Sequence, residues 1–169
     1  LTEVIGSKVF HSALVNRASK HLHPLKYAQG LAKAAVDAGV EIYEHSAVIG
    51  YSGTPLLIKT ARGQVTAKEM ILACNGYIGK LEPRINGRIM PINNFMLATE
   101  PLSDELAAQI CPLDTSMSDS RFVINYWKLS ADNRLLFGGG ENYRRGFPAD
   151  IKGFVRKYML SIYPQLSDT

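Results

Sequence analysis

The sequence contains only two cysteines, Cys74 and Cys111, and no long apolar run. Two cysteines at this spacing form neither a disulfide framework nor a metal-ligand motif, so we expect no metal site and two buried thiols in a reducing compartment. No segment has the length of a membrane span, and no basic-then-apolar signal opens the chain. We therefore expect a soluble, cytoplasmic protein.

Charge is also sparse. Charged residues make up 20% of the chain, and the formal net charge is +4. Lysines and arginines are scattered, and we interpret the Arg144 and Arg145 pair as a solvated loop, so the sequence offers no basic patch for nucleic acid. The hydrophobic fraction of 46% is typical of a globular domain and excludes a disordered chain.

Recognisable catalytic motifs are missing as well. The sequence shows no Ser-His-Asp, paired-carboxylate or metal constellation, and it lacks the phosphate-binding pattern G-x-G-x-x-G. Gly138, Gly139 and Gly140 follow a predicted strand, but they lead into Glu141 rather than into a helix. No single motif therefore identifies a chemistry.

The strongest local prediction is a helix at residues 24–39. Pro24 suits a first helical position because the N–H of that position has no partner within the helix. Gly39 suits a left-handed exit from the helix. Apolar residues recur at three- and four-residue spacing, mostly as alanine, which allows close packing on a sheet. These residues are Leu25, Ala28, Leu31, Ala32, Ala35 and Val36.

Short strand-like runs follow this helix. Residues 40–44 predict one strand, and residues 47–51, 56–60 and 64–67 predict three more that are separated by turns containing glycine and proline. The last three runs together predict an antiparallel meander.

The continuous apolar run at residues 70–74 predicts a strand that is covered on both faces, as in a parallel sheet. Asn75 and Gly76 then predict a tight turn. Small residues at the end of such a strand leave backbone free for a ligand, because ligands of open α/β sheets bind beyond the carboxyl ends of the strands. An ordinary buried strand followed by a turn has the same pattern.

The remaining strands are expected at both ends of the chain. Residues 9–15 predict one strand, and residues 89–100 predict a long strand that Pro91 interrupts. Residues 122–127 and 134–137 predict a hairpin that ends at residues 138–140.

Two helices are expected in the second half. Ser103 caps a short helix that ends before Pro112, and Asp150 caps a final helix with a sustained apolar stripe that ends before Pro164. The composition changes near residues 76–88, which we take as an internal boundary.

Several stretches, in this order, resemble the FAD-dependent D-amino-acid and glycine oxidase family, and within it the gamma-glutamylputrescine oxidase-like branch. No single stretch would be sufficient, but together they span nearly the whole chain. They are HLHPLKY (21–27), residues 40–48, LACNGY (72–77), ATEPL (98–102), LSAD (129–132), RLLFGGG (134–140) and YPQL (163–166).

The resemblance implies a mixed α/β fold. It comprises part of a flavoprotein dinucleotide-binding fold with a β-meander crossover, together with a substrate domain of largely antiparallel sheet and helices. Residues 1–22 would be a strand segment of the substrate domain, residues 23–80 part of the FAD-binding domain, and residues 81–169 a further part of the substrate domain.

The resemblance also implies a function. Such enzymes oxidise the CH–NH bond of an amine or amino acid with FAD and pass the electrons to oxygen, which gives an imine or carbonyl compound, ammonia and hydrogen peroxide. The cofactor carries this chemistry, so few acid or base side chains are needed. The alternative is a catalytically inert α/β binding or assembly module that lacks a cofactor and uses exposed sheet edges for self-association.

Site residues follow from the resemblance alone. Val48 would border the adenine, and four residues at the end of the apolar run and in the turn after it would lie near the diphosphate. Two aromatic residues and one histidine would contact the amine substrate, although strand alternation allows only one of the aromatic pair to do so. Packing and capping roles remain open for all of them. The diphosphate residues are Ala73, Cys74, Asn75 and Gly76, and the substrate residues are Tyr126, Trp127 and His23.

The chain also departs from the family pattern. The glycine-rich turn at the family's amino end and the flavin-contacting segment at its carboxyl end are both missing, so we expect an internal fragment that binds FAD weakly by itself. Lys128 stands where related sequences tend to carry arginine. Because lysine lacks the bidentate fork of arginine, the mode of carboxylate recognition is open.

Overall fold

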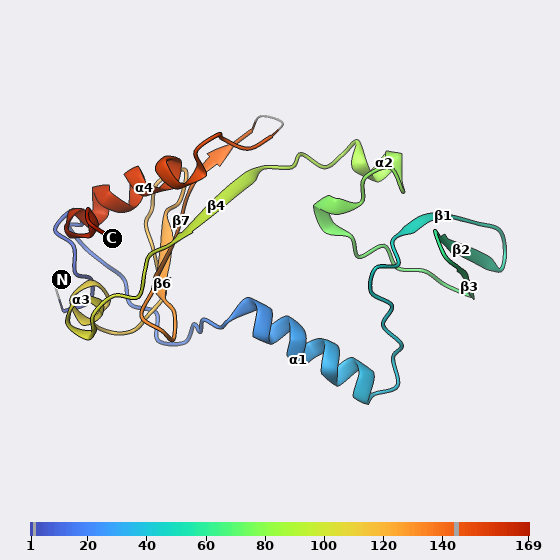
Figure 1. The fold of residues 1–169 in the computed structure, drawn as a ribbon, viewed down its shortest axis with the longest axis horizontal. Coiled ribbons are helices and arrows are strands. Elements are labelled where there is room, and N and C mark those ends of the chain that lie inside the picture. Colours follow the sequence, from blue (N-terminus) through green and yellow to red (C-terminus); the bar gives the residue numbers. More distant parts are fainter. Residues whose placement is uncertain (2, 144–145) are drawn as a thin grey trace. The chain divides into compact units, whose positions relative to one another are not determined.

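The computed structural model describes residue 1, residues 3–143 and residues 146–169. The chain forms two compact units (Figure 1). One comprises Leu1–His21 together with Ile92–Thr169, and the other comprises Leu22–Pro91. The predicted loop at Arg144 and Arg145 lies outside the described residues.

The unit Leu22–Pro91 begins with helix α1, Pro24–Asp37, as predicted. Gly39 follows it with a left-handed φ of 89°. The expected packing of this helix on a sheet is wrong, since no residue of α1 is buried and Leu31 is exposed. α1 has 14 residues, and among the described residues no helix is long and apolar enough to cross a membrane.

The predicted meander is confirmed. Strands β1 (Val48–Ser52), β2 (Leu56–Thr60) and β3 (Gln64–Ala67) form an antiparallel sheet in the order β1-β2-β3. Gly53 provides the left-handed φ of 85° at the first turn. At the second turn the Thr60 amide donates to the Gly63 carbonyl.

Three predicted strands do not form. Residues 9–15, 40–44 and 70–74 are irregular, and Ile71 is 89% exposed instead of buried. The physical reason is that a strand needs neighbours for its N–H and C=O groups, and no strand in the described part of the chain pairs with these segments. After the last segment come a 3-10 helix, Asn75–Tyr77, and helix α2, Pro83–Asn86.

The other unit contains a four-stranded antiparallel sheet in the order β4-β7-β6-β5. Its strands are β4 (Asn93–Ala98), β5 (Met117–Ser118), β6 (Tyr126–Leu129) and β7 (Leu135–Asn142). The predicted hairpin is confirmed as β6 and β7, but residues 122–125 of its predicted first strand are irregular. β4 begins after Pro91. The predicted end of the hairpin at residues 138–140 is wrong, because all three glycines lie inside β7.

Space explains these three glycines. A Cβ atom at Gly138 would lie 2.3 Å from Tyr126 Cε2, one at Gly139 would lie 2.5 Å from Asn125 Oδ1, and one at Gly140 would meet the Phe154 ring. Glycine within a strand often marks such close approach. β7 therefore has glycine at these three positions because atoms of neighbouring side chains occupy the space that a side chain would need.

In the described part of this unit, two α-helices, both capped as predicted, and the 3-10 helix Pro164–Leu166 accompany the sheet. The Ser103 hydroxyl accepts from the Leu106 amide at the start of α3 (Asp104–Ile110), and Asp150 accepts from the Gly153 amide at the start of α4 (Ile151–Ile162). α4 packs on β7 and β4 (Figure 1). The core between sheet and helices consists of residues such as Phe95, Ile110, Trp127, Leu135, Phe137, Val155, Met159 and Tyr163.

Candidate functional site

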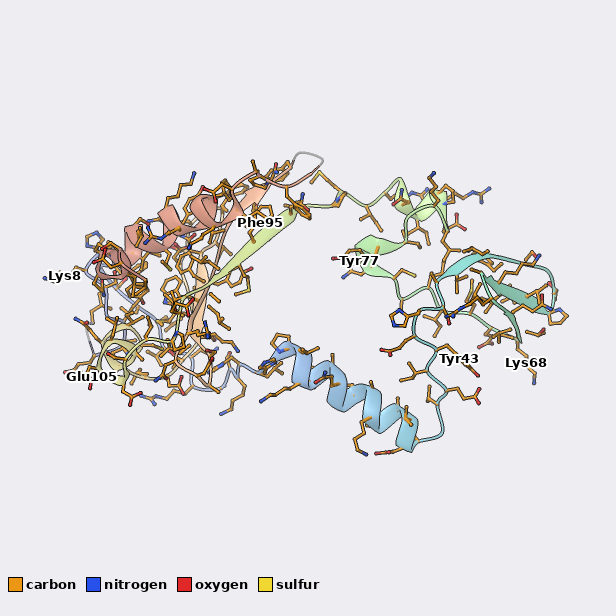
Figure 2. The ribbon with its side chains drawn as sticks, in the orientation of Figure 1. Lys8, Tyr43, Lys68, Tyr77, Phe95 and Glu105 are labelled. Carbon is orange, nitrogen blue, oxygen red and sulfur yellow. The ribbon has the colours of Figure 1, made fainter. Side chains whose placement is uncertain are left out.

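The four-stranded sheet has one covered face and one open face. Phe95, Trp127 and Phe137 point into the core, and Figure 2 labels Phe95 on β4. The alternate residues of the same strands form the other face, which we call the open face: Asn94, Met96, Ala98, Tyr126, Lys128, Leu136 and Gly138. The open face is where this unit can receive a ligand or another part of a larger protein.

Trp127 lies on the covered face and is only 2% exposed. Its ring stacks on Phe137 with centroids 5.6 Å apart and on Phe10 at 6.0 Å. Its indole Nε1 donates to the Tyr163 hydroxyl at 2.9 Å. Of the two aromatic residues predicted to contact substrate, Trp127 is thus a core residue with its polar atom paired.

Tyr126 is the member of the pair that lies on the open face, where it is 36% exposed. It stands opposite Gly138 of β7, and its hydroxyl donates to Asn94 Oδ1 of β4 at 2.6 Å. The side chain therefore spans from β6 across β7 to β4. Desolvation raises the pKa of the Tyr126 hydroxyl, which favours the neutral form.

Sequence reasoning did not identify Asn94 and Gly138 as parts of this site. Asn94 carries no local signal, because it contacts Tyr126 only through the order of strands in the sheet. Gly138 did carry one: a glycine after four strand-forming residues is typical of a strand that continues beneath a close neighbour. The sequence pattern of the triglycine run predicts a strand end instead.

A pocket of about 730 Å³ lies within the same unit. The irregular segment 10–21 lines one side, and residues 113–120 line the other, with Trp127 also at its wall. His21 Nε2 lies 3.4 Å from the Asp114 carbonyl oxygen and links the two sides. The wall residue Asp119 is internally paired, since it accepts from the Asn125 backbone amide at 2.9 Å and from Asn125 Nδ2 at 2.7 Å.

The residues predicted to border the cofactor lie in the other unit. Val48 begins β1 and pairs with Thr60. Ala73 is exposed and Cys74 half-buried, so the prediction of a buried thiol holds for Cys111 but not for Cys74. The predicted turn after them is a 3-10 helix in which the Tyr77 amide donates to the Cys74 carbonyl at 3.0 Å.

Asn75 and Gly76 form an accessible piece of backbone. Asn75, not the glycine, has a left-handed φ, 49°. A Cβ atom built at Gly76 meets nothing within 4 Å, and the neighbouring Tyr77 side chain is 93% exposed and extends from the ribbon in Figure 2. The backbone here is open to a ligand, as one wall of a diphosphate site requires. The glycine-rich turn that would form the opposite wall is not in the sequence, so the residues fit one wall only.

His23 caps helix α1. Its Nδ1 accepts a hydrogen bond from the Lys26 amide at 3.3 Å. His23 belongs to the unit Leu22–Pro91, whereas Tyr126 and Trp127 belong to the other unit. His23 thus caps the helix through Nδ1. Its other ring nitrogen, Nε2, is the one that can contact a substrate.

The chain belongs to the family of FAD-dependent oxidoreductases: the family model described as DAO, FAD dependent oxidoreductase, matches residues 2–169. The resemblance drawn from the sequence is thereby confirmed. So is the mixed α/β fold class.

Individual relatives refine this assignment. The chain is 40% identical to a protein named probable oxidoreductase OrdL from Rhizobium meliloti over 97% of its own length. It is also 40% identical to the gamma-glutamylputrescine oxidoreductase of Escherichia coli over 96% of its length. The chain spans 38% of the length of each relative.

A solved structure shares the fold. The L-proline dehydrogenase from P. horikoshii matches 86% of this chain with a TM-score of 0.64, and the match covers 40% of that protein. The sequence identity is 18%, so this likeness concerns the fold alone.

Proposed function

We propose that the protein containing this chain is an FAD-dependent enzyme that oxidises the CH–NH bond of an amine or amino acid and uses oxygen as the electron acceptor. The observation that carries this proposal is the 40% identity to a gamma-glutamylputrescine oxidoreductase over 96% of the chain. Because the chain spans about two fifths of that relative, the activity belongs to the longer protein.

The proposed reaction breaks the C–H bond next to the nitrogen. Bound FAD would supply the hydride acceptor and would pass two electrons to oxygen, which together with two protons would give hydrogen peroxide. The substrate loses the hydride and one N–H proton and becomes an imine, and water converts the imine to a carbonyl compound and ammonia. The protein's task is to hold the amine carbon at the acceptor and to exclude bulk water from it.

We assign the residues of this chain to two tasks. Tyr126 on the open face contacts the substrate, and Trp127 supports the strand from the covered side through its paired Nε1. His23 offers Nε2 to the substrate while Nδ1 caps α1. Val48 and the accessible backbone of Ala73, Cys74, Asn75 and Gly76 form one wall of the FAD site.

The isolated 169-residue chain is proposed to be inactive. A diphosphate is normally held by a glycine turn at a helix amino terminus, and this sequence supplies only the facing wall. The second candidate function, an inert binding or assembly module, is favoured for the isolated chain by one observation: α1 buries none of its apolar residues.

A substrate panel tests the proposal. The complete protein, encoded by the full reading frame, is purified with FAD and mixed without oxygen with gamma-glutamylputrescine, putrescine, glycine, D-alanine and L-proline. A 2-hydroxy acid serves as the matched control without an amine. We expect at least one amine to bleach the flavin absorbance, and subsequent admission of air to release hydrogen peroxide. A flavoprotein that no amine bleaches would rule the proposal out, and bleaching without peroxide would make the protein a dehydrogenase instead of an oxidase.

A further inference from the structure

The Tyr126 hydroxyl can act as donor or acceptor, and its contact with Asn94 decides which role remains. A phenolic hydroxyl has one proton and two acceptor lone pairs. The proton lies in the 2.6 Å hydrogen bond to Asn94 Oδ1. What the hydroxyl can still offer to a ligand on the open face is therefore a lone pair, which is an acceptor.

The neighbouring strands also fix the position of the Tyr126 hydroxyl. Gly138 lies directly opposite Tyr126 in the register of β6 and β7, and a Cβ atom there would lie 2.3 Å from Tyr126 Cε2 and Cζ and 2.7 Å from the hydroxyl. Only glycine leaves room for the ring to lie across β7. Three neighbouring strands thus cooperate: β6 supplies the ring, β7 the space beneath it, and β4 the amide that holds its hydroxyl.

We propose that Asn94 and Gly138 are positioning residues that hold the Tyr126 hydroxyl as a hydrogen-bond acceptor for the N–H of an amine substrate. This inference rests on the proposed function, and it specifies how that function distinguishes its substrates. An ammonium or amine nitrogen with at least one N–H is complementary to the acceptor. A carboxylate or carbonyl oxygen is not, because the donor of Tyr126 is already engaged by Asn94.

The test compares an amine that carries N–H groups with a derivative that has none. One is the amine that bleaches the flavin in the panel above, and the other is its fully N-methylated derivative, which keeps a positive charge but has no N–H. Binding of each is measured by calorimetry on the complete protein, reduced beforehand with dithionite and kept without oxygen so that no turnover occurs. The readout is the ratio of the two dissociation constants, which is independent of activity.

Four variants separate the roles of these residues. We expect the amine with N–H groups to bind the parent about tenfold more tightly than it binds Tyr126→Phe, as for one hydrogen bond to a charged group. The dissociation constant of the N-methylated derivative should be the same for both proteins. Asn94→Asp keeps an acceptor for the Tyr126 proton and should retain the preference. Asn94→Ala frees the hydroxyl to turn, and Gly138→Ala displaces the ring, so both should lose most of the preference.

Two controls keep the outcomes separable. Melting temperatures establish that each variant is folded, and the N-methylated derivative reports any general damage to the site. An unchanged preference in Tyr126→Phe would overturn the inference, and so would loss of the preference in Asn94→Asp together with its retention in Asn94→Ala. If no amine bleaches the flavin at all, the proposed function itself fails. If an amine does but the preference is independent of Tyr126, only this inference fails.

Discussion

The indole nitrogen of Trp127 donates a 2.9 Å hydrogen bond to the hydroxyl of Tyr163, and both side chains are buried. The Tyr163 hydroxyl in turn donates to the Ile110 carbonyl oxygen at 3.3 Å. The three residues belong to β6, to the end of α4 and to the end of α3. Within the unit that contains the four-stranded sheet, these contacts join β6 to the ends of two helices through polar atoms.

The first prediction follows from that link. Tyr163→Phe would leave the Trp127 N–H buried without a partner, which costs about 1–3 kcal/mol of unfolding free energy. Urea denaturation of the parent and the variant measures the loss. In the double variant with Trp127→Phe the orphaned donor is gone, so the combined loss should be smaller than the sum of the two single losses. Additive losses would show that the pair is not coupled.

The second prediction concerns pH. Burial raises the pKa of the Tyr163 hydroxyl well above its ordinary value of 10.0. The unfolded chain therefore releases this proton first, so the contribution of Tyr163 to stability is full below about pH 10 and falls above it, by up to ~1.4 kcal/mol per pH unit. Denaturation at alkaline pH should show a shallower decline in Tyr163→Phe than in the parent. Identical slopes would mean that Tyr163 ionises in the folded protein as it does in the unfolded one.

The meander was predictable almost to the residue because its signals are local. Gly53, Pro55 and Gly63 mark the two turns, and each strand pairs with the strand next to it in the sequence. The capped helices were predictable for the same reason: Ser103 and Asp150 each accept a hydrogen bond from an amide three residues ahead. What is decided within a few residues can be inferred from those residues.

The strands that were predicted but do not form depend on distant partners. Residues 40–44 and 70–74 have the composition of strands, but a strand is formed only when a neighbour pairs with it, and none does in the described residues. In the candidate site on the open face, Tyr126 followed from the family resemblance and Gly138 carried a local signal as a glycine within a strand. Asn94 joins them only through the order β4-β7-β6. Sequence spacing contains no information on that order.

The third prediction tests the proposed wall of the FAD site. A side chain at Gly76 meets nothing within 4 Å, so Gly76→Val in the complete protein should change the melting temperature little. It should weaken FAD retention, because the added side chain occupies the space where the backbone would approach the diphosphate. Gly63→Val is the matched control, since Gly63 is equally open but lies in the turn between β2 and β3. Equal FAD affinity for Gly76→Val, Gly63→Val and the parent would remove residues 73–76 from the site.

The fourth prediction concerns the isolated 169-residue chain. Ile71 is 89% exposed within an unpaired segment, and exposed apolar segments with free backbone groups recruit partners. We expect the isolated chain to self-associate in sedimentation experiments and Ile71→Glu to shift it toward the monomer. Leu14→Glu is the control, because Leu14 is 95% exposed but belongs to the other unit. A monomeric parent chain, or an equal effect of both substitutions, would contradict the assignment of the contact to residues 70–74.

The most direct test of the account is the anaerobic mixing of the complete flavoprotein with amines, followed at the absorbance band of the oxidised flavin. We predict that an amine bleaches this band, and that deuterium on the carbon bearing the nitrogen slows the bleaching because the C–H bond breaks in that step. Bleaching by a 2-hydroxy acid but by no amine would contradict it, since the enzyme would then oxidise a different bond.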